Sequence, residues 1–144
     1  MDRVLVSDDF HLDEFIPKAL YESKASWKLL YLLDNRIINV AQFLRNRYGA
    51  ATINNWAVGG DRNCSGFRYY SEECKQYYSL TSQHSHGRAV DIIFKNISAA
   101  EIRKDIKEHN HLKDMLLNLG ARRIEDGVSW LHIDAANTNY FTFF

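Results

Sequence analysis

The stretch TSQHSHGRAVDIIF, residues 81–94, joins a polar segment that contains two histidines to an apolar segment that contains one aspartate. The apolar half is rich in β-branched residues and is typical of a strand. Because side chains alternate across a strand, Val90 and Ile92 share one face and Asp91 points to the other. A buried strand seldom carries an aspartate. The stretch therefore predicts a strand with an apolar core side and a polar side that carries chemistry.

A second strand with the same two-sided pattern follows in SWLHIDA, residues 129–135. Its side chains divide between an apolar face, with Leu131 and Ile133, and an opposite face, with Trp130, His132 and Asp134. If the two strands lie in one sheet, Asp91 and His132 face the same surface. His84 then reaches that surface from the loop that precedes the first strand.

Two imidazoles and one carboxylate form a set of three protein ligands for zinc. His84, Asp91 and His132 leave the fourth position open for water, as in catalytic zinc sites. Zinc in such a site activates water and polarises a carbonyl group. Each residue has an ordinary structural explanation when it is taken alone, but their placement on matched faces favours a metal site. We expect Asp134, two residues beyond His132, to orient that imidazole from outside the ligand set.

The length of 144 residues is typical of one domain, and we expect a single domain over residues 1–144. The 18 basic and 18 acidic residues give a net charge of zero, so the composition indicates no nucleic-acid partner. The sequence has no apolar run of membrane-spanning length and no signal-peptide pattern at its N-terminus. We therefore expect a protein made in the cytoplasm without a signal peptide and without a membrane partner. The oligomeric state stays open.

The sequence contains two cysteines, Cys64 and Cys74, which could form one disulfide at most. Without a secretion signal, two reduced thiols in a reducing compartment are the expectation. We expect both to be dispensable for metal binding, since the three ligands above complete a catalytic set.

The remaining sequence predicts helices and short strands around this site. The expected elements are a helical turn in residues 11–23, an amphipathic helix in 27–49, a strand in 51–58, an irregular segment in 59–82, helices from 98 and in 111–120, and a hairpin in 121–135. Ser98 and Glu101 match a capping box, which predicts that the helix from residue 98 begins there. The pair Asp126-Gly127 predicts a two-residue hairpin turn. This order favours an α+β fold with a small, largely antiparallel sheet over a doubly wound sheet.

Three short motifs are similar to those of the zinc D-alanyl-D-alanine peptidases, a family that shares its fold with hedgehog signalling domains. The motifs are SGFR (65–68), SQHSHGRAVDI (82–92) and WLHID (130–134). In that family a histidine and an aspartate seven positions apart bind zinc together with a later histidine, so the resemblance implies His84, Asp91 and His132 as ligands. It also implies a hedgehog/D,D-peptidase-like fold, with a small, mainly antiparallel sheet and helices packed on one face. The resemblance extends over residues 54–135.

The same resemblance implies two catalytic roles. The family's arginine in the SGYR-like motif steadies negative charge on the substrate carbonyl, and Arg68 occupies that place; guanidinium donors suit an oxyanion. Several members place a glutamate, as general base, three residues before the last ligand, where this chain has Ser129. Glu125 and Asp126 are the carboxylates available for that role. Glu125 ends a predicted strand and has the reach to lean over the metal, whereas Asp126 suits the turn itself.

Residues beside the predicted ligands complete the candidate site. We expect Ser82 and Trp130 to contact substrate or to support the ligands, although Ser82 could instead cap a turn. Several tyrosines crowd the irregular segment and suit one wall of a peptide groove: Tyr69, Tyr70, Tyr77 and Tyr78.

The resemblance implies a zinc-dependent metallopeptidase that cleaves D-amino-acid-containing peptides of bacterial peptidoglycan, as a carboxypeptidase or an endopeptidase. The chain is similar in particular to phage-type, endolysin-like enzymes of cell-wall degradation, which act on the wall after release or as part of a virion. Zn²⁺ is then the cofactor and a peptidoglycan peptide the substrate. The alternative is a catalytically inactive metal-binding structural or virion-associated module on the same fold, because Ser129 replaces the usual base.

Overall fold

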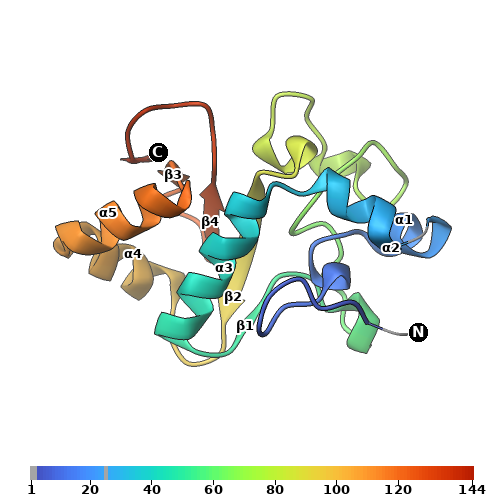
Figure 1. Cartoon of the computed structure of the whole chain (residues 1–144), viewed down its shortest axis with the longest axis horizontal. Coiled ribbons are helices and arrows are strands. Elements are labelled where there is room, and N and C mark those ends of the chain that lie inside the picture. The colour runs from blue at the N-terminus through green and yellow to red at the C-terminus, as the bar shows by residue number, and fades with distance from the viewer. Residues whose placement is uncertain (1–2, 25) are drawn as a thin grey trace.

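The computed structural model describes residues 3–24 and 26–144 (Figure 1). Within these ranges the chain forms five α-helices, which are Lys18–Ser23 (α1), Ser26–Leu29 (α2), Asn35–Tyr48 (α3), Ala99–Glu108 (α4) and Asn110–Leu119 (α5). The strands in the same ranges are Ala51–Thr52 (β1), Ala89–Phe94 (β2), Arg123–Ile124 (β3), Leu131–Asp134 (β4) and Thr142–Phe143 (β5). They form one sheet in the order β1-β2-β4-β3-β5, in which β3 and β5 are parallel and the other neighbours are antiparallel. The predicted mixture of helices and strands is confirmed.

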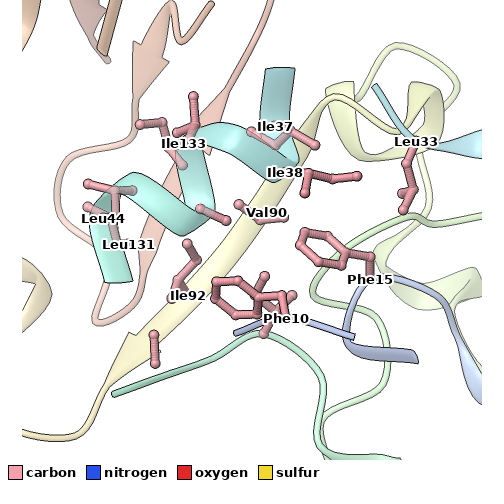
Figure 2. Close-up of a cluster of buried hydrophobic side chains, with 14 of the residues drawn as sticks. Phe10, Phe15, Leu33, Ile37, Ile38, Leu44, Val90, Ile92, Leu131 and Ile133 are labelled. Carbon is pink, nitrogen blue, oxygen red and sulfur yellow. The ribbon is translucent and has the colours of Figure 1, made fainter. Parts of the chain in front are cut away.

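Helices pack against the sheet and form the core with it (Figure 2). Helix α3 contacts β2, α4 contacts β4, and α5 packs beside α3 and α4. The side chains that β2 and β4 contribute to this core are completely buried: Val90, Ile92, Leu131 and Ile133. They belong to the same apolar cluster as Ile37 and Leu44 of α3. The predicted apolar faces of both strands are confirmed, and the opposite face of the sheet is left for polar side chains.

The helix predicted over residues 27–49 is not continuous: α2 and a 3₁₀ turn, Leu30–Leu32, are followed by a break before α3. Helix α3 begins only at Asn35, because Leu33 has an extended backbone and Asp34 caps the new helix. The Asp34 carboxylate accepts hydrogen bonds from the Arg36 backbone N–H at 2.9 Å and from Arg36 Nε at 3.0 Å. None of the helices in the described ranges is long and apolar enough to cross a membrane.

Close packing at Gly87 accounts for this break. The Asp34 N–H donates to the Gly87 carbonyl at 3.0 Å. Gly87 has a φ of 67°, in the left-handed region that favours glycine, and a Cβ there would overlap the Leu32 carbonyl. The segment before α3 is thereby held against the turn that leads into β2.

The strand predicted over residues 51–58 is also shorter than expected. It ends at Thr52, and Trp56–Val58 forms a 3₁₀ turn instead. The intervening Asn54 is buried, and its side-chain oxygen accepts a hydrogen bond from the Ser65 N–H at 2.9 Å. This contact draws the irregular segment toward the sheet in place of a longer strand pair.

The two-residue hairpin turn predicted at residues 126–127 is wrong, because residues 125–130 connect β3 to β4. Helix α4 holds this longer connection in place. Arg103 donates hydrogen bonds to the Val128 carbonyl at 2.7 Å and to the Trp130 carbonyl at 3.1 Å. A buried guanidinium thus fixes a loop that lies next to the polar face of the sheet.

Cys64 and Cys74 form a disulfide, so the expectation of two reduced thiols is wrong. The irregular segment folds back on itself and brings the two residues together, with their Cα atoms 5.8 Å apart. Cys74 is completely buried. The bond ties together two parts of the segment over residues 59–82.

Candidate metal centre

Three side chains converge on the polar face of the sheet. Asp91 on β2 and His132 on β4 are directly opposite each other in the strand pairing. His84 reaches them from a 3₁₀ turn, Gln83–His86, that precedes β2. His84 Nε2 lies 3.2 Å from both Asp91 Oδ1 and His132 Nδ1, and the latter two atoms are 2.9 Å apart. All three residues are buried, with exposed fractions of 2% for His84, 7% for Asp91 and 8% for His132.

The outer nitrogen of each imidazole has its own hydrogen-bond acceptor. His84 Nδ1 lies 2.7 Å from the carbonyl oxygen of Gly66, and His132 Nε2 lies 3.1 Å from Asp134 Oδ2. A carbonyl only accepts, so the ring proton of neutral His84 sits on Nδ1 and Nε2 presents a lone pair. Both nitrogens of His132 face carboxylate oxygens, so the protonated ring donates to Asp134 and to Asp91. A neutral His132 that keeps its proton on Nε2 presents a lone pair on Nδ1.

When both imidazoles are neutral and protonated on their outer nitrogens, the three atoms that face one another are all available as metal ligands. A proton on one of the inner nitrogens, or a metal ion among the three atoms, offsets the negative charge of Asp91 at these distances. The set matches the protein ligands of zinc in number and in kind, with room for a further ligand. The residues present thus fit a zinc ion.

The pKa shifts of the three residues also indicate that a positive charge is stabilised at this centre. Burial disfavours the charged form of Asp91, but hydrogen bonds with His132 and His84 outweigh it and hold the pKa of Asp91 well below its ordinary value. Burial lowers the pKa of His84. Burial also opposes the charge on His132, yet Asp134 and Asp91 raise the pKa of His132 to about 9. A positive charge is thus stabilised between the two carboxylates.

Three consecutive backbone carbonyls, those of residues 64–66, orient the centre from one side, and we call them the carbonyl cradle. In chain order they accept hydrogen bonds from Arg68 Nε at 2.6 Å, Asp91 N at 2.7 Å and His84 Nδ1 at 2.7 Å. A Cβ at Gly66 would overlap the Phe15 carbonyl, so glycine permits the close approach of the cradle to the N-terminal part of the chain. The disulfide at Cys64 anchors one end of the cradle.

Arg68 contacts a candidate ligand directly. Its Nη2 donates to Asp91 Oδ2 at 2.6 Å, while Asp91 Oδ1 faces the two imidazoles. Arg68 Nη1 lies 3.5 Å from the carbonyl of Tyr77. The arginine therefore fixes the rotation of the Asp91 carboxylate.

Asp134 supports His132 from the other side. It has an exposed fraction of 0%, and its carboxylate also accepts hydrogen bonds from Arg123 Nε at 3.1 Å and Nη2 at 2.8 Å. Sequence reasoning missed Arg123. The β3–β4 register places Arg123 opposite Asp134, so the correct strand pairing would have indicated it.

The centre opens onto a cleft made of two adjoining cavities. The first, which we call the metal cavity, has a volume of about 340 Å³ and is lined by His84, Asp91 and His132 among others. The second, which we call the side cavity, has a volume of about 530 Å³. The two share four lining residues: Arg68, Tyr77, Asp91 and Trp130. The cleft thus gives the centre access to solvent and to a ligand.

The two candidate general bases lie in different places. Glu125 lines the metal cavity, and its backbone N–H donates to the His132 carbonyl at 3.3 Å. Asp126 does not line either cavity; its carboxylate accepts hydrogen bonds from Lys107 Nζ at 2.8 and 2.9 Å. Only Glu125 is brought to the centre.

Ser82 and Trp130, which we expected beside the ligands, both line the metal cavity. Ser82 Oγ also accepts a hydrogen bond from the His84 N–H at 3.3 Å, so this serine caps the turn that carries the ligand. Trp130 is partly exposed between the two cavities. Sequence reasoning missed Gln83 and Phe144, which line the same cavity without a motif to mark them.

Comparison of the chain with family models, with curated proteins and with solved structures finds no match. The assignment of the site therefore rests on its own geometry and on the sequence motifs.

Proposed function

We propose that the chain is a zinc-dependent peptidase that cleaves D-amino-acid-containing peptides of bacterial peptidoglycan. One observation carries the reaction class: His84, Asp91 and His132 each offer one ligand atom, these atoms face one another within 3.2 Å, and the three residues line a cavity. The substrate class comes from the resemblance of the SGFR, SQHSHGRAVDI and WLHID motifs to D-alanyl-D-alanine peptidases. The hedgehog/D,D-peptidase-like fold is part of the same proposal.

Glu125 is the general base in this proposal. When bound, zinc supplies a Lewis acid that polarises a carbonyl group and acidifies water. The metal cavity is lined by three carboxylates, of which Asp91 belongs to the ligand set and Asp134 is engaged by His132 and Arg123. Glu125 remains to accept a proton from the attacking water and to return it to the leaving amine.

Arg68 has two tasks in this proposal. A guanidinium has five N–H donors, and three hydrogen bonds within the described residues engage Arg68, to the Cys64 carbonyl, the Tyr77 carbonyl and Asp91. Those bonds position Asp91. The two remaining donors are available to the oxygen of the substrate carbonyl as negative charge develops there.

A catalytically inactive metal-binding module is the second candidate. The observation that favours it is the ion pair between Arg68 and Asp91, which gives this arginine a structural task. Ser129 adds support, since it stands where the resembling enzymes carry their glutamate. On this reading the centre holds zinc for stability alone.

The disulfide supports a site of action outside a reducing compartment. Disulfides persist mainly in oxidising surroundings. The Cys64–Cys74 bond fixes the segment that carries Arg68 and the carbonyl cradle. An enzyme that reaches the cell wall would keep this bond.

Digestion of purified peptidoglycan separates the two candidates. The zinc-loaded chain is incubated with walls of several peptide chemotypes, and newly exposed amino and carboxyl groups are measured. We expect release that stops with a chelator and returns with zinc, and no release by His132→Ala. Stoichiometric zinc in a folded wild-type chain that releases nothing from any wall would leave only the binding module.

A further inference from the structure

The side cavity is built almost entirely by the disulfide-tied segment. Beyond the four residues shared with the metal cavity, it is lined by Asp61, Arg62, Asn63, Cys64, Ser65, Glu73 and Gln76. Its volume of about 530 Å³ exceeds that of the metal cavity, and it adjoins the candidate ligand Asp91. A substrate bound at the metal centre therefore has a second compartment open beside it.

Arg62 presents a fixed positive charge in this compartment. Its Nε donates to the Ile53 carbonyl at 2.7 Å, and its Nη2 donates to the Asp91 backbone carbonyl at 2.9 Å. Both partners are neutral, and Arg62 forms no ion pair with any of the described residues. Burial lowers the pKa of Arg62, yet an arginine stays charged at neutral pH. The guanidinium is thus oriented by the backbone but not neutralised.

Asp61 presents the opposite charge in the same compartment. It is exposed and lines the cavity, and it forms no ion pair within the described ranges. The Asp91 and Asp61 carboxylates are both near enough to favour the charged form of Arg62, although neither forms an ion pair with it among the described residues. Glu73 differs from Asp61 because its carboxylate accepts hydrogen bonds from the Ala19 N–H at 3.1 and 3.3 Å.

We propose that the side cavity binds a zwitterionic amino-acid head group, with its carboxylate at Arg62 and its ammonium at Asp61. A guanidinium pairs with a carboxylate through charge-assisted hydrogen bonds, and a carboxylate does the same with an ammonium. A partner with only one of the two charges would leave the other side chain unmatched. This proposal rests on the proposed function. It implies that the substrate of the peptidase carries a free amino-acid group next to the cleaved bond.

Four small probes test the two charges separately. D-alanine carries both charges, and N-acetyl-D-alanine carries only the negative one. D-alanine amide carries only the positive charge, and N-acetyl-D-alanine amide carries neither. Binding to the full-length chain is followed by NMR, first without metal and then after zinc loading. We expect D-alanine to bind about 10-fold more tightly than either singly charged probe, and the neutral probe to bind most weakly.

Two variants assign each charge to its side chain. Arg62→Gln should reduce D-alanine affinity to that of D-alanine amide, and Asp61→Asn should reduce it to that of N-acetyl-D-alanine. Glu72→Gln is the matched control, since Glu72 belongs to the same segment, pairs with Lys75 and lies outside the cavity. Asp61 is exposed, so Asp61→Asn keeps the test open even where Arg62→Gln fails to fold.

The outcomes distinguish this inference from the proposed function. Equal affinity for all four probes, or dependence on one charge only, would overturn the zwitterion site even in an active peptidase. The expected selectivity in a chain that cleaves no wall peptide would support the site and reject the peptidase.

Discussion

Asp91 and His132 face each other across the β2–β4 pair, with Asp91 Oδ1 2.9 Å from His132 Nδ1. Residues directly opposite in an antiparallel pair project from the same face of the sheet. Two of the three candidate ligands are therefore fixed by the backbone ladder, and only His84 comes from outside the sheet. The relative position of these two candidate ligands is thus a property of the sheet itself.

We predict about one zinc per chain, held by His84, Asp91 and His132. Substitution of His84 or His132 by alanine removes a candidate ligand atom and should abolish stoichiometric zinc, as measured by elemental analysis of protein purified without added metal. His86→Ala is the matched control, because His86 Nε2 lies 2.9 Å from the Leu80 carbonyl and the residue does not line the metal cavity. Full zinc occupancy in His132→Ala would place the metal elsewhere.

Glu125→Gln should lower turnover by about 10²-fold or more while zinc content and folding stay unchanged. The amide keeps the size of the side chain but cannot accept the proton. Asp126→Asn is the control, because Asp126 pairs with Lys107 outside the cavity and should cost less than about 1 kcal/mol of stability. Release of peptide fragments from peptidoglycan is the measurement; loss of release in Asp126→Asn alone would assign the base to Asp126.

Asp134→Asn should weaken zinc binding by about 10-fold to 100-fold without removing a ligand. The substitution keeps the volume but withdraws the negative charge that orients His132 and pairs with Arg123. Competition with a chelator of known affinity measures the change. Asp105→Asn serves as the control, since Asp105 also pairs with an arginine but lies on α4 away from the cleft. Equal affinity in the two variants would contradict the supporting role of Asp134.

The double substitution Cys64→Ser, Cys74→Ser should leave zinc content unchanged, because the ligand set contains no sulfur. It should lower the free energy of unfolding by about 2–3 kcal/mol, since it frees a closed loop with a sequence separation of 10. Elemental analysis and denaturant unfolding measure the two effects. A folded double variant that has lost its zinc would show that the disulfide is needed to hold the carbonyl cradle against His84 and Asp91.

The stabilising contribution of Asp34 should depend on pH. Hydrogen bonds from Arg36 hold the pKa of Asp34 below its ordinary value of 3.8, so the charged form stabilises the cap of α3 above that pH. The contribution should disappear as the pH falls below 3.8 and through the lower pKa of the folded state. Asp34→Asn keeps a capping residue without the charge, and should cost up to about 1 kcal/mol near pH 7. Unfolding curves of both proteins should converge in acid; a constant difference across pH would contradict this.

The two faces of β2 and β4 could be predicted from sequence because alternation in a strand is a local property. The apolar residues Val90 and Ile133 are buried in the core, and the polar pair Asp91 and His132 lies on the opposite side of the sheet. The same alternation placed Asp134 beside His132, where it accepts a hydrogen bond.

Features that depend on distant contacts could not be predicted in this way. The apolar spacing over residues 27–49 continues through Leu33, and only the contact between Asp34 and Gly87 explains why the helix restarts. The Asp126-Gly127 pair suits a short turn, but Arg103 on α4 holds a longer loop. Arg103 is distant in sequence from both ends of that loop, so no local pattern reveals it.

The carbonyl cradle of residues 64–66 allows amino-acid substitutions beside the candidate centre. Its hydrogen bonds to Arg68, Asp91 and His84 come from main-chain oxygens, which every amino acid possesses. Ser65 can thus be exchanged without loss of its contact to Asp91, whereas Gly66 is restrained by the Phe15 carbonyl rather than by the histidine it serves. Apart from Gly66, two proteins could therefore share this arrangement of hydrogen bonds with little sequence similarity over the cradle.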